Sequence, residues 1–106
     1  MQANGLVFDP ERLRNAAEEA VAALKLLANP ERLLLLCQLS QGEFSVGELE
    51  QRLGIHQPTL SQQLGVLRNQ GVVATRREGK NVYYSIADTA VLEILLVLYR
   101  IYCPKE

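Results

Sequence analysis

The chain has 106 residues, 48% of them hydrophobic, which is ordinary for one small globular domain, and we interpret residues 1–106 as a single domain. Its formal net charge is −1, which excludes a uniformly basic nucleic-acid binder. No secretory signal segment opens the sequence, and the apolar run at residues 94–98 is far shorter than the ~20 residues that span a bilayer. We therefore expect a cytoplasmic protein with no membrane partner.

Two helices are predicted in the first third of the chain. Over residues 10–27, apolar side chains recur at the spacing of one helix face. A second helix is predicted to start after the N-cap residue Asn29, with Pro30 in its first turn, and to run to about Gln41. It contains four consecutive leucines, which cannot share one face, so we expect this helix to be buried on most sides.

Residues 45–71 predict a helix-turn-helix. Ser45 and the glutamate three residues later form the S-x-x-E pattern of a capping box, which satisfies two backbone N–H groups at a helix start. Gly54 is suited to end that helix, because glycine adopts a left-handed backbone at little cost. A second helix is predicted from about Gln57 to Gly71. Two short helices joined by a tight turn let one cross a DNA backbone while the other enters the major groove.

Residues 72–86 predict a β-hairpin, which we call the wing. Two segments rich in Val, Tyr and Ile alternate apolar with polar residues and flank a connection at residues 79–81. The basic residues Arg76, Arg77 and Lys80 would give the wing a second point of attachment to a duplex.

Charge is unevenly distributed along the chain. Residues 57–86 carry four basic side chains and one acidic one, whereas the residues before 57 carry five basic and eight acidic ones. A positive field confined to the helix-turn-helix and the wing indicates double-stranded DNA as the partner. The acidic remainder should discourage indiscriminate binding.

Contacts to DNA are expected from the start of the second helix of the helix-turn-helix and from the wing. Glutamine pairs bidentately with adenine, serine and threonine contact bases or phosphates, and arginine and lysine bind phosphates. The expected DNA-binding residues are His56, Gln57, Thr59, Ser61, Gln62, Gln63, Arg77 and Lys80.

A last helix is predicted over residues 88–102, with Asp88 as its N-cap. Apolar side chains cover nearly its whole circumference, although a helix at the end of a small monomer has only one side to bury. We therefore expect residues 10–27 and 88–102 to form a homodimer interface. A two-fold dimer would engage two half-sites about one helical turn apart, in an operator that is an imperfect palindrome.

Cys37 and Cys103 are the only two cysteines. From the residues alone, two unrelated buried cysteines are the simpler interpretation, because free cysteine packs like a small hydrophobe. Zinc and copper sites need three or four N or S ligands, and two cysteines with the single histidine, His56, do not assemble one, so we expect no metal and no cofactor. Cys37 with His56 also lacks the orienting acid and oxyanion hole of a nucleophilic enzyme, so we expect no catalysis.

The segments LKLLANPERLLLLCQL, SVGELEQRLGIHQPTLSQQLGVLRNQGVV and RREGKNVYYSI, in this order, resemble the ArsR/SmtB family of bacterial winged-helix repressors. The resemblance covers about residues 20–90. It implies a mainly α fold with a small β-hairpin, a winged helix-turn-helix ordered as four helices, two strands and a fifth helix. It also implies a homodimer built from the first and last helices, and repression that a small inducer relieves.

The same resemblance bears on the sensing site. Metal sites of the family use cysteines at the start of the third helix or histidines and carboxylates on the last one; residues 45–49 hold no cysteine and residues 88–102 no histidine. The pair Cys37 and Cys103 resembles the sulfide- and persulfide-responsive branch of the family. It implies that a small sulfur species reacts covalently with this redox-sensing pair to give a disulfide or polysulfide bridge. Two alternatives stay open: a metalloid sensor using the same two thiols, and a winged-helix module that binds protein instead of DNA.

Overall fold

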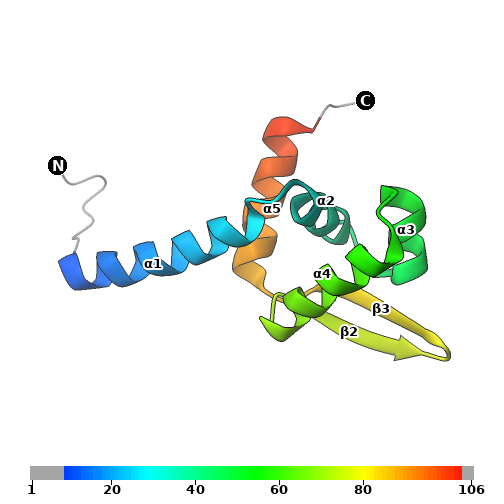
Figure 1. Ribbon diagram of the computed structural model, residues 1–106. Coiled ribbons are helices and arrows are strands. Elements are labelled where there is room, and N and C mark those ends of the chain that lie inside the picture. Colours follow the sequence, from blue (N-terminus) through cyan, green and yellow to red (C-terminus); the bar gives the residue numbers. More distant parts are fainter. Residues whose placement is uncertain (1–8, 104–106) are drawn as a thin grey trace.

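Five helices and three short strands make up a winged helix-turn-helix in the computed structural model, which describes residues 9–103 (Figure 1). The predicted single domain, residues 1–106, includes residues 1–8 and 104–106, which lie outside the described residues. The helices are α1 (Pro10–Leu27), α2 (Pro30–Leu39), α3 (Val46–Leu53), α4 (Gln57–Asn69) and α5 (Thr89–Tyr102). The strands are β1 (Phe44–Ser45), β2 (Val73–Glu78) and β3 (Asn81–Ile86).

The predicted helix starts carry the caps that the sequence indicated. Asn29 Oδ1 accepts a hydrogen bond from the Arg32 backbone N–H at 2.9 Å. Ser45 and Glu48 form both hydrogen bonds of the capping box. Asp88 accepts from two backbone N–H groups at the start of α5. Each cap satisfies N–H groups that a helix start leaves without a partner, so these starts were predictable from local sequence.

Helix ends follow the glycines less closely. Gly54 has a φ of +69° after α3, as predicted, and this left-handed conformation favours glycine. By contrast, α4 ends at Asn69, two residues before Gly71, which itself has a φ of +75°. Helix α2 ends at Leu39 and not at Gln41, because the chain tightens into turns there: the N–H of Gln41 donates to the carbonyl of Gln38.

The sheet has one more strand than the sequence predicted. Its order is β1-β3-β2, both pairs antiparallel, and β1 contributes only Phe44 and Ser45 opposite Tyr84 and Tyr83. A two-residue strand is too short to show an alternating pattern, so it was missed. It ties the start of α3 to the wing, which is the hairpin of β2 and β3.

The core lies between α2, α3, α4 and the base of α5. Leu60, Leu64 and Leu67 of α4 are fully buried, as their spacing predicts for the inner face of that helix. Helix α2 was expected to be buried on most sides. Leu35 and Leu36 are fully buried, but Leu34 departs from this expectation, because it is 47% exposed. Its side chain faces a pocket beside α5 and not the core.

Helix α1 projects away from the rest of the molecule, while the wing reaches out beside α4 (Figure 1). Only Leu26 and Leu27, at the end of α1, are buried. Within residues 9–103, no helix is both long and apolar enough to cross a membrane.

Candidate functional site

The start of α4 presents an exposed polar surface. Gln57, Ser61 and Gln62 are exposed, and Thr59 is half-buried. His56 is the N-cap of α4; it is exposed, and its side chain makes no capping hydrogen bond. Because the leucines of α4 fill the opposite face, these polar side chains are turned away from the core.

Gln63 differs from its neighbours on α4. It is half-buried, and its Oε1 accepts a hydrogen bond from Arg32 Nε of α2 at 3.0 Å. A terminal nitrogen of Arg32 also donates to the carbonyl of Leu26 in α1 at 3.1 Å. One guanidinium therefore links α1, α2 and α4. We refer to this as the Arg32 link; sequence analysis missed Arg32, because no local pattern pairs residues that lie so far apart in the chain.

Two basic residues of the wing face solvent. Arg77 and Lys80 are exposed, and neither makes an ion pair with any residue in 9–103. Glu78 pairs with Asn81 in the strand register, so Gly79 and Lys80 form a two-residue turn, with Gly79 at a φ of +64°. This turn places Lys80 at the tip of the wing.

Arg76 stands apart from these two residues, although the sequence grouped it with them. Its guanidinium forms a salt bridge with Glu43 at 2.9 Å and one with Glu78 at 3.2 Å, and it lies over the ring of Tyr83. The hydrogen bond from Arg76 lowers the pKa of Glu43 below its usual value. Arg76 thus joins the wing to the turn before β1, and its charge is largely neutralised by two carboxylates.

The fold brings Cys37 and Cys103 to one place. Cys37 lies on α2 and Cys103 directly follows α5; both are half-buried free thiols and both line the same pocket. Burial raises the pKa of the Cys37 thiol, and the neighbouring Cys103 raises it further. Two cysteines far apart in sequence are therefore close enough to act on one another electrostatically.

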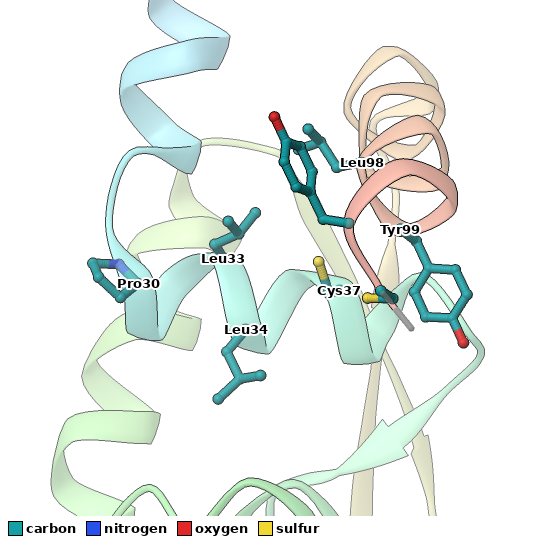
Figure 2. A pocket seen from close by; sticks show the side chains of 8 residues that line it. Pro30, Leu33, Leu34, Cys37, Leu98 and Tyr99 are labelled. Atoms are coloured by element: carbon teal, nitrogen blue, oxygen red, sulfur yellow. The ribbon is translucent and has the colours of Figure 1, made fainter. Parts of the chain in front are cut away.

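The pocket beside the two cysteines has a volume of about 530 Å³ and an apolar wall. Its α2 side is made by Pro30, Leu33, Leu34 and Cys37 (Figure 2). Leu98, Tyr99 and Tyr102 of α5 make the other side. Among the described residues, no charged side chain lines it.

A metal centre is not apparent in the same region. No three His, Cys, Asp or Glu side chains gather in a metal-binding arrangement within the part of the chain that the structure describes. The only histidine, His56, belongs to the start of α4 and does not line the cysteine pocket.

Comparison with known proteins places this architecture among bacterial regulators. The family model described as "Bacterial regulatory protein, arsR family" matches residues 29–75. The "Biofilm growth-associated repressor" of Agrobacterium fabrum (strain C58) is 53% identical over 94 residues, which are 89% of this chain and 80% of that protein. HlyU of Vibrio cholerae, named a transcriptional activator, is 40% identical over 102 residues, 96% of this chain and 94% of that protein.

Solved structures agree. The transcriptional repressor BigR from Xylella fastidiosa has 48% sequence identity and a TM-score of 0.81, over 92% of this chain and 100% of that chain. Reduced HlyU from Vibrio cholerae has 41% identity and a TM-score of 0.83, over 89% of this chain and 99% of that chain.

Proposed function

Because this chain belongs to the arsR family of bacterial regulatory proteins, we propose that it represses transcription from an operator and that thiol chemistry at Cys37 and Cys103 releases the DNA. Proteins of this family are transcriptional regulators that bind operator DNA and are not enzymes. Repression is supported by the names of two relatives, the biofilm growth-associated repressor and BigR. The single observation that carries the thiol switch is the pocket that both cysteines line.

The proposed DNA surface has two parts. Gln57, Ser61 and Gln62 project from the exposed face of α4 and would enter the major groove, with Thr59 and His56 at its edge. Arg77 and Lys80 of the wing, which are free of ion pairs among residues 9–103, would bind phosphates on a second stretch of the duplex. The half-buried Gln63 would position α4 through the Arg32 link, whatever contact it also makes with DNA.

The proposed homodimer uses apolar surface on α1 and α5. Leu24 of α1 is 58% exposed and Ile101 of α5 is 61% exposed, and other large apolar side chains lie beside them. Unpaired apolar faces of this kind mark association surfaces. Because α1 stands away from the rest of its own subunit, a second subunit would bury what α1 leaves exposed (Figure 1). Two subunits would then address the two half-sites of an imperfect palindrome.

The proposed inducer is a small sulfane-sulfur species such as a persulfide or polysulfide. One cysteine thiolate attacks the S–S bond of the donor, forms a mixed disulfide and expels the first sulfur leaving group. The second thiolate then attacks the cysteine sulfur of that mixed disulfide and expels the rest of the donor. The two protons that the thiols lose neutralise the two leaving groups. If the first cysteine carries at least two donor-derived sulfurs, the second thiolate can instead attack the one bonded to the cysteine sulfur; the distal part of the donor then leaves as a thiolate, and the bridge retains an extra sulfur atom.

A bridge would affect DNA binding through α2. Cys37 and Arg32 lie on the same helix, and Arg32 donates to Gln63 on the DNA-facing helix α4. Tying Cys37 to the end of α5 would also couple α2 to the proposed dimer interface. Release of DNA requires only that the bridged form disfavour the DNA-competent dimer by about 1–3 kcal/mol, that is, about 5- to 150-fold in affinity.

The test is operator binding before and after treatment with a persulfide donor, for the wild type and for Cys37→Ser and Cys103→Ser. We expect the treated wild type to lose affinity and both variants to keep it. If either variant still releases DNA on treatment, a two-cysteine bridge is not the switch.

The two alternatives give different results in the same assay. Release by arsenite at concentrations where the persulfide donor has no effect would favour a metalloid sensor using the two thiols. Failure of the untreated protein to bind any operator while it captures a protein partner would favour an interaction module.

A further inference from the structure

The wall of the cysteine pocket is apolar, although a reaction at a thiol does not by itself require apolar surroundings. Leucine side chains and two tyrosines form most of it, and the described residues contribute no charged group. A donor only needs access to a sulfur atom, which a polar surface would also give. An apolar cavity next to two thiols instead favours a ligand with an apolar body, because removing that body from water adds binding free energy.

The pocket borders the apolar stripe that α5 offers to a second subunit, and Leu98 belongs to both. Ile94, Val97 and Ile101 recur at i, i+3 and i+7 on α5 and share one face. Tyr99 and Tyr102, which line the pocket, project from another face of the same helix. A second subunit on the Ile94 stripe would therefore meet the pocket at Leu98, whereas Tyr99 lies beyond Leu98 on the side away from the stripe.

The position of the two sulfurs and the size of the pocket also favour a ligand with an apolar body. The two sulfurs are the reactive atoms in the wall, and Figure 2 shows the Cys37 side chain between the leucines of α2 and the end of α5. A volume of about 530 Å³ lies within the range of small-molecule sites, about 300–1,000 Å³. A short alkyl group fits this space, whereas a carboxylate buried there would find no charged partner among the described residues.

We propose that the pocket lined by Leu33, Leu34, Leu98 and Tyr99 binds the hydrocarbon part of an uncharged organic polysulfide and so directs its S–S bond to Cys37 and Cys103. The proposal rests on the thiol switch described above and names the class of donor that it accepts. The ligand class is a dialkyl polysulfide, in preference to one with ionised arms.

The reaction balances for a dialkyl trisulfide, R–S–S–S–R. One cysteine thiolate attacks a terminal sulfur, giving a cysteine–S–S–R mixed disulfide and expelling the alkyl persulfide R–S–SH after protonation. The second thiolate attacks the cysteine sulfur of the mixed disulfide and expels the alkanethiol R–SH. The two cysteines are oxidised to a disulfide, and the trisulfide is reduced to a persulfide and a thiol.

The test compares symmetrical trisulfides with methyl, ethyl and propyl arms and one with 2-carboxyethyl arms, which match propyl in length. The rate of bridge formation in the full-length protein, followed by intact mass, is divided by the rate of the same donor with N-acetylcysteine. Each step lengthens both arms by one methylene, and we expect this ratio to rise by up to about fourfold per step if the pocket fully buries one of the two arms. We expect the carboxyethyl donor to fall at least about tenfold below the propyl one.

Variants at exposed positions separate the pocket from a general surface effect. Leu34→Lys places an ammonium group at the pocket wall and should weaken the preference for propyl over carboxyethyl arms. Val66→Lys is the matched control, because Val66 is a similarly exposed apolar residue on α4 that does not line the pocket. It should leave the preference unchanged.

Two outcomes overturn the inference, and they differ. In the first, the ratio of the bridge-formation rate to the N-acetylcysteine rate depends neither on arm length nor on arm charge, so the pocket does not select the donor. A partner subunit that covers the pocket would give this result. The thiol switch would still stand. If no donor of either kind forms a bridge, the thiol switch fails together with the inference.

Discussion

Replacing Gln63 by methionine tests whether this residue positions α4 or contacts a base. Methionine keeps the length and the helix propensity of glutamine but removes the oxygen that accepts from Arg32 Nε at 3.0 Å. Hydrogen bonds to charged groups contribute about 1.5–3 kcal/mol. Since both partners are half-buried, we expect the lower end, a loss of about 1.5 kcal/mol in the free energy of unfolding.

A double-mutant cycle isolates the Arg32 link. Gln63→Met and Arg32→Met each break the same hydrogen bond, so the double variant should lose less than the sum of the two single losses, by about 1.5 kcal/mol. Urea unfolding at one fixed protein concentration measures stability, since the proposed dimer makes stability depend on concentration. Operator affinity, measured by fluorescence anisotropy, should show the same non-additivity.

Gln62→Met is the matched control. Gln62 is the exposed neighbour of Gln63, and no hydrogen bond to Arg32 involves it. This change should weaken operator binding without altering the free energy of unfolding. Three results together would refute our reasoning on Gln63. Gln63→Met, like Gln62→Met, would weaken operator binding without changing the free energy of unfolding, and Arg32→Met would leave operator affinity unchanged. The losses of the two single variants, Gln63→Met and Arg32→Met, would add in the double variant.

Three further predictions concern the wing, the core and the thiol. Lys80→Ala should reduce the slope of log affinity against log salt concentration by about 2, because the proposed homodimer loses one phosphate contact in each subunit; an unchanged slope would remove Lys80 from the interface. Leu64→Ala should cost about 2–5 kcal/mol in urea unfolding, since Leu64 is fully buried, and a loss below about 1 kcal/mol would contradict its place in the core. Alkylation of Cys37 by iodoacetamide should have its pH midpoint above that of N-acetylcysteine, because burial and Cys103 both raise its pKa. In Cys103→Ser the midpoint should fall but stay raised, as burial is the larger cause; a midpoint at the value of N-acetylcysteine in the wild type would contradict this.

Most of the fold follows from local sequence. Caps such as Ser45 and Asp88 fix helix starts through hydrogen bonds within a few residues, and the spacing of leucines in α4 fixes its buried face. Strand β1 could not be predicted, because its two residues form a strand only through their pairing with Tyr83 and Tyr84. Its existence depends on tertiary structure.

The site was less predictable than the fold for the same reason. Arg76 was grouped with the DNA-facing charges of the wing, but Glu43, far earlier in the chain, takes up its guanidinium. Arg32 gave no local signal, since its partner Gln63 lies on another helix. The proximity of Cys37 and Cys103 was implied only by a family resemblance, because spacing within a helix says nothing about the end of another.

The most direct test of the thiol switch follows bridge formation and DNA release in one sample. A protein–operator complex is titrated with a sulfane-sulfur donor, and each point is split between anisotropy and non-reducing peptide mapping by mass spectrometry. The account predicts that the fraction of released DNA rises together with the fraction of peptides joining Cys37 to Cys103, and that thiol reductant reverses both. Release that is complete while the two cysteines remain in separate peptides would contradict it.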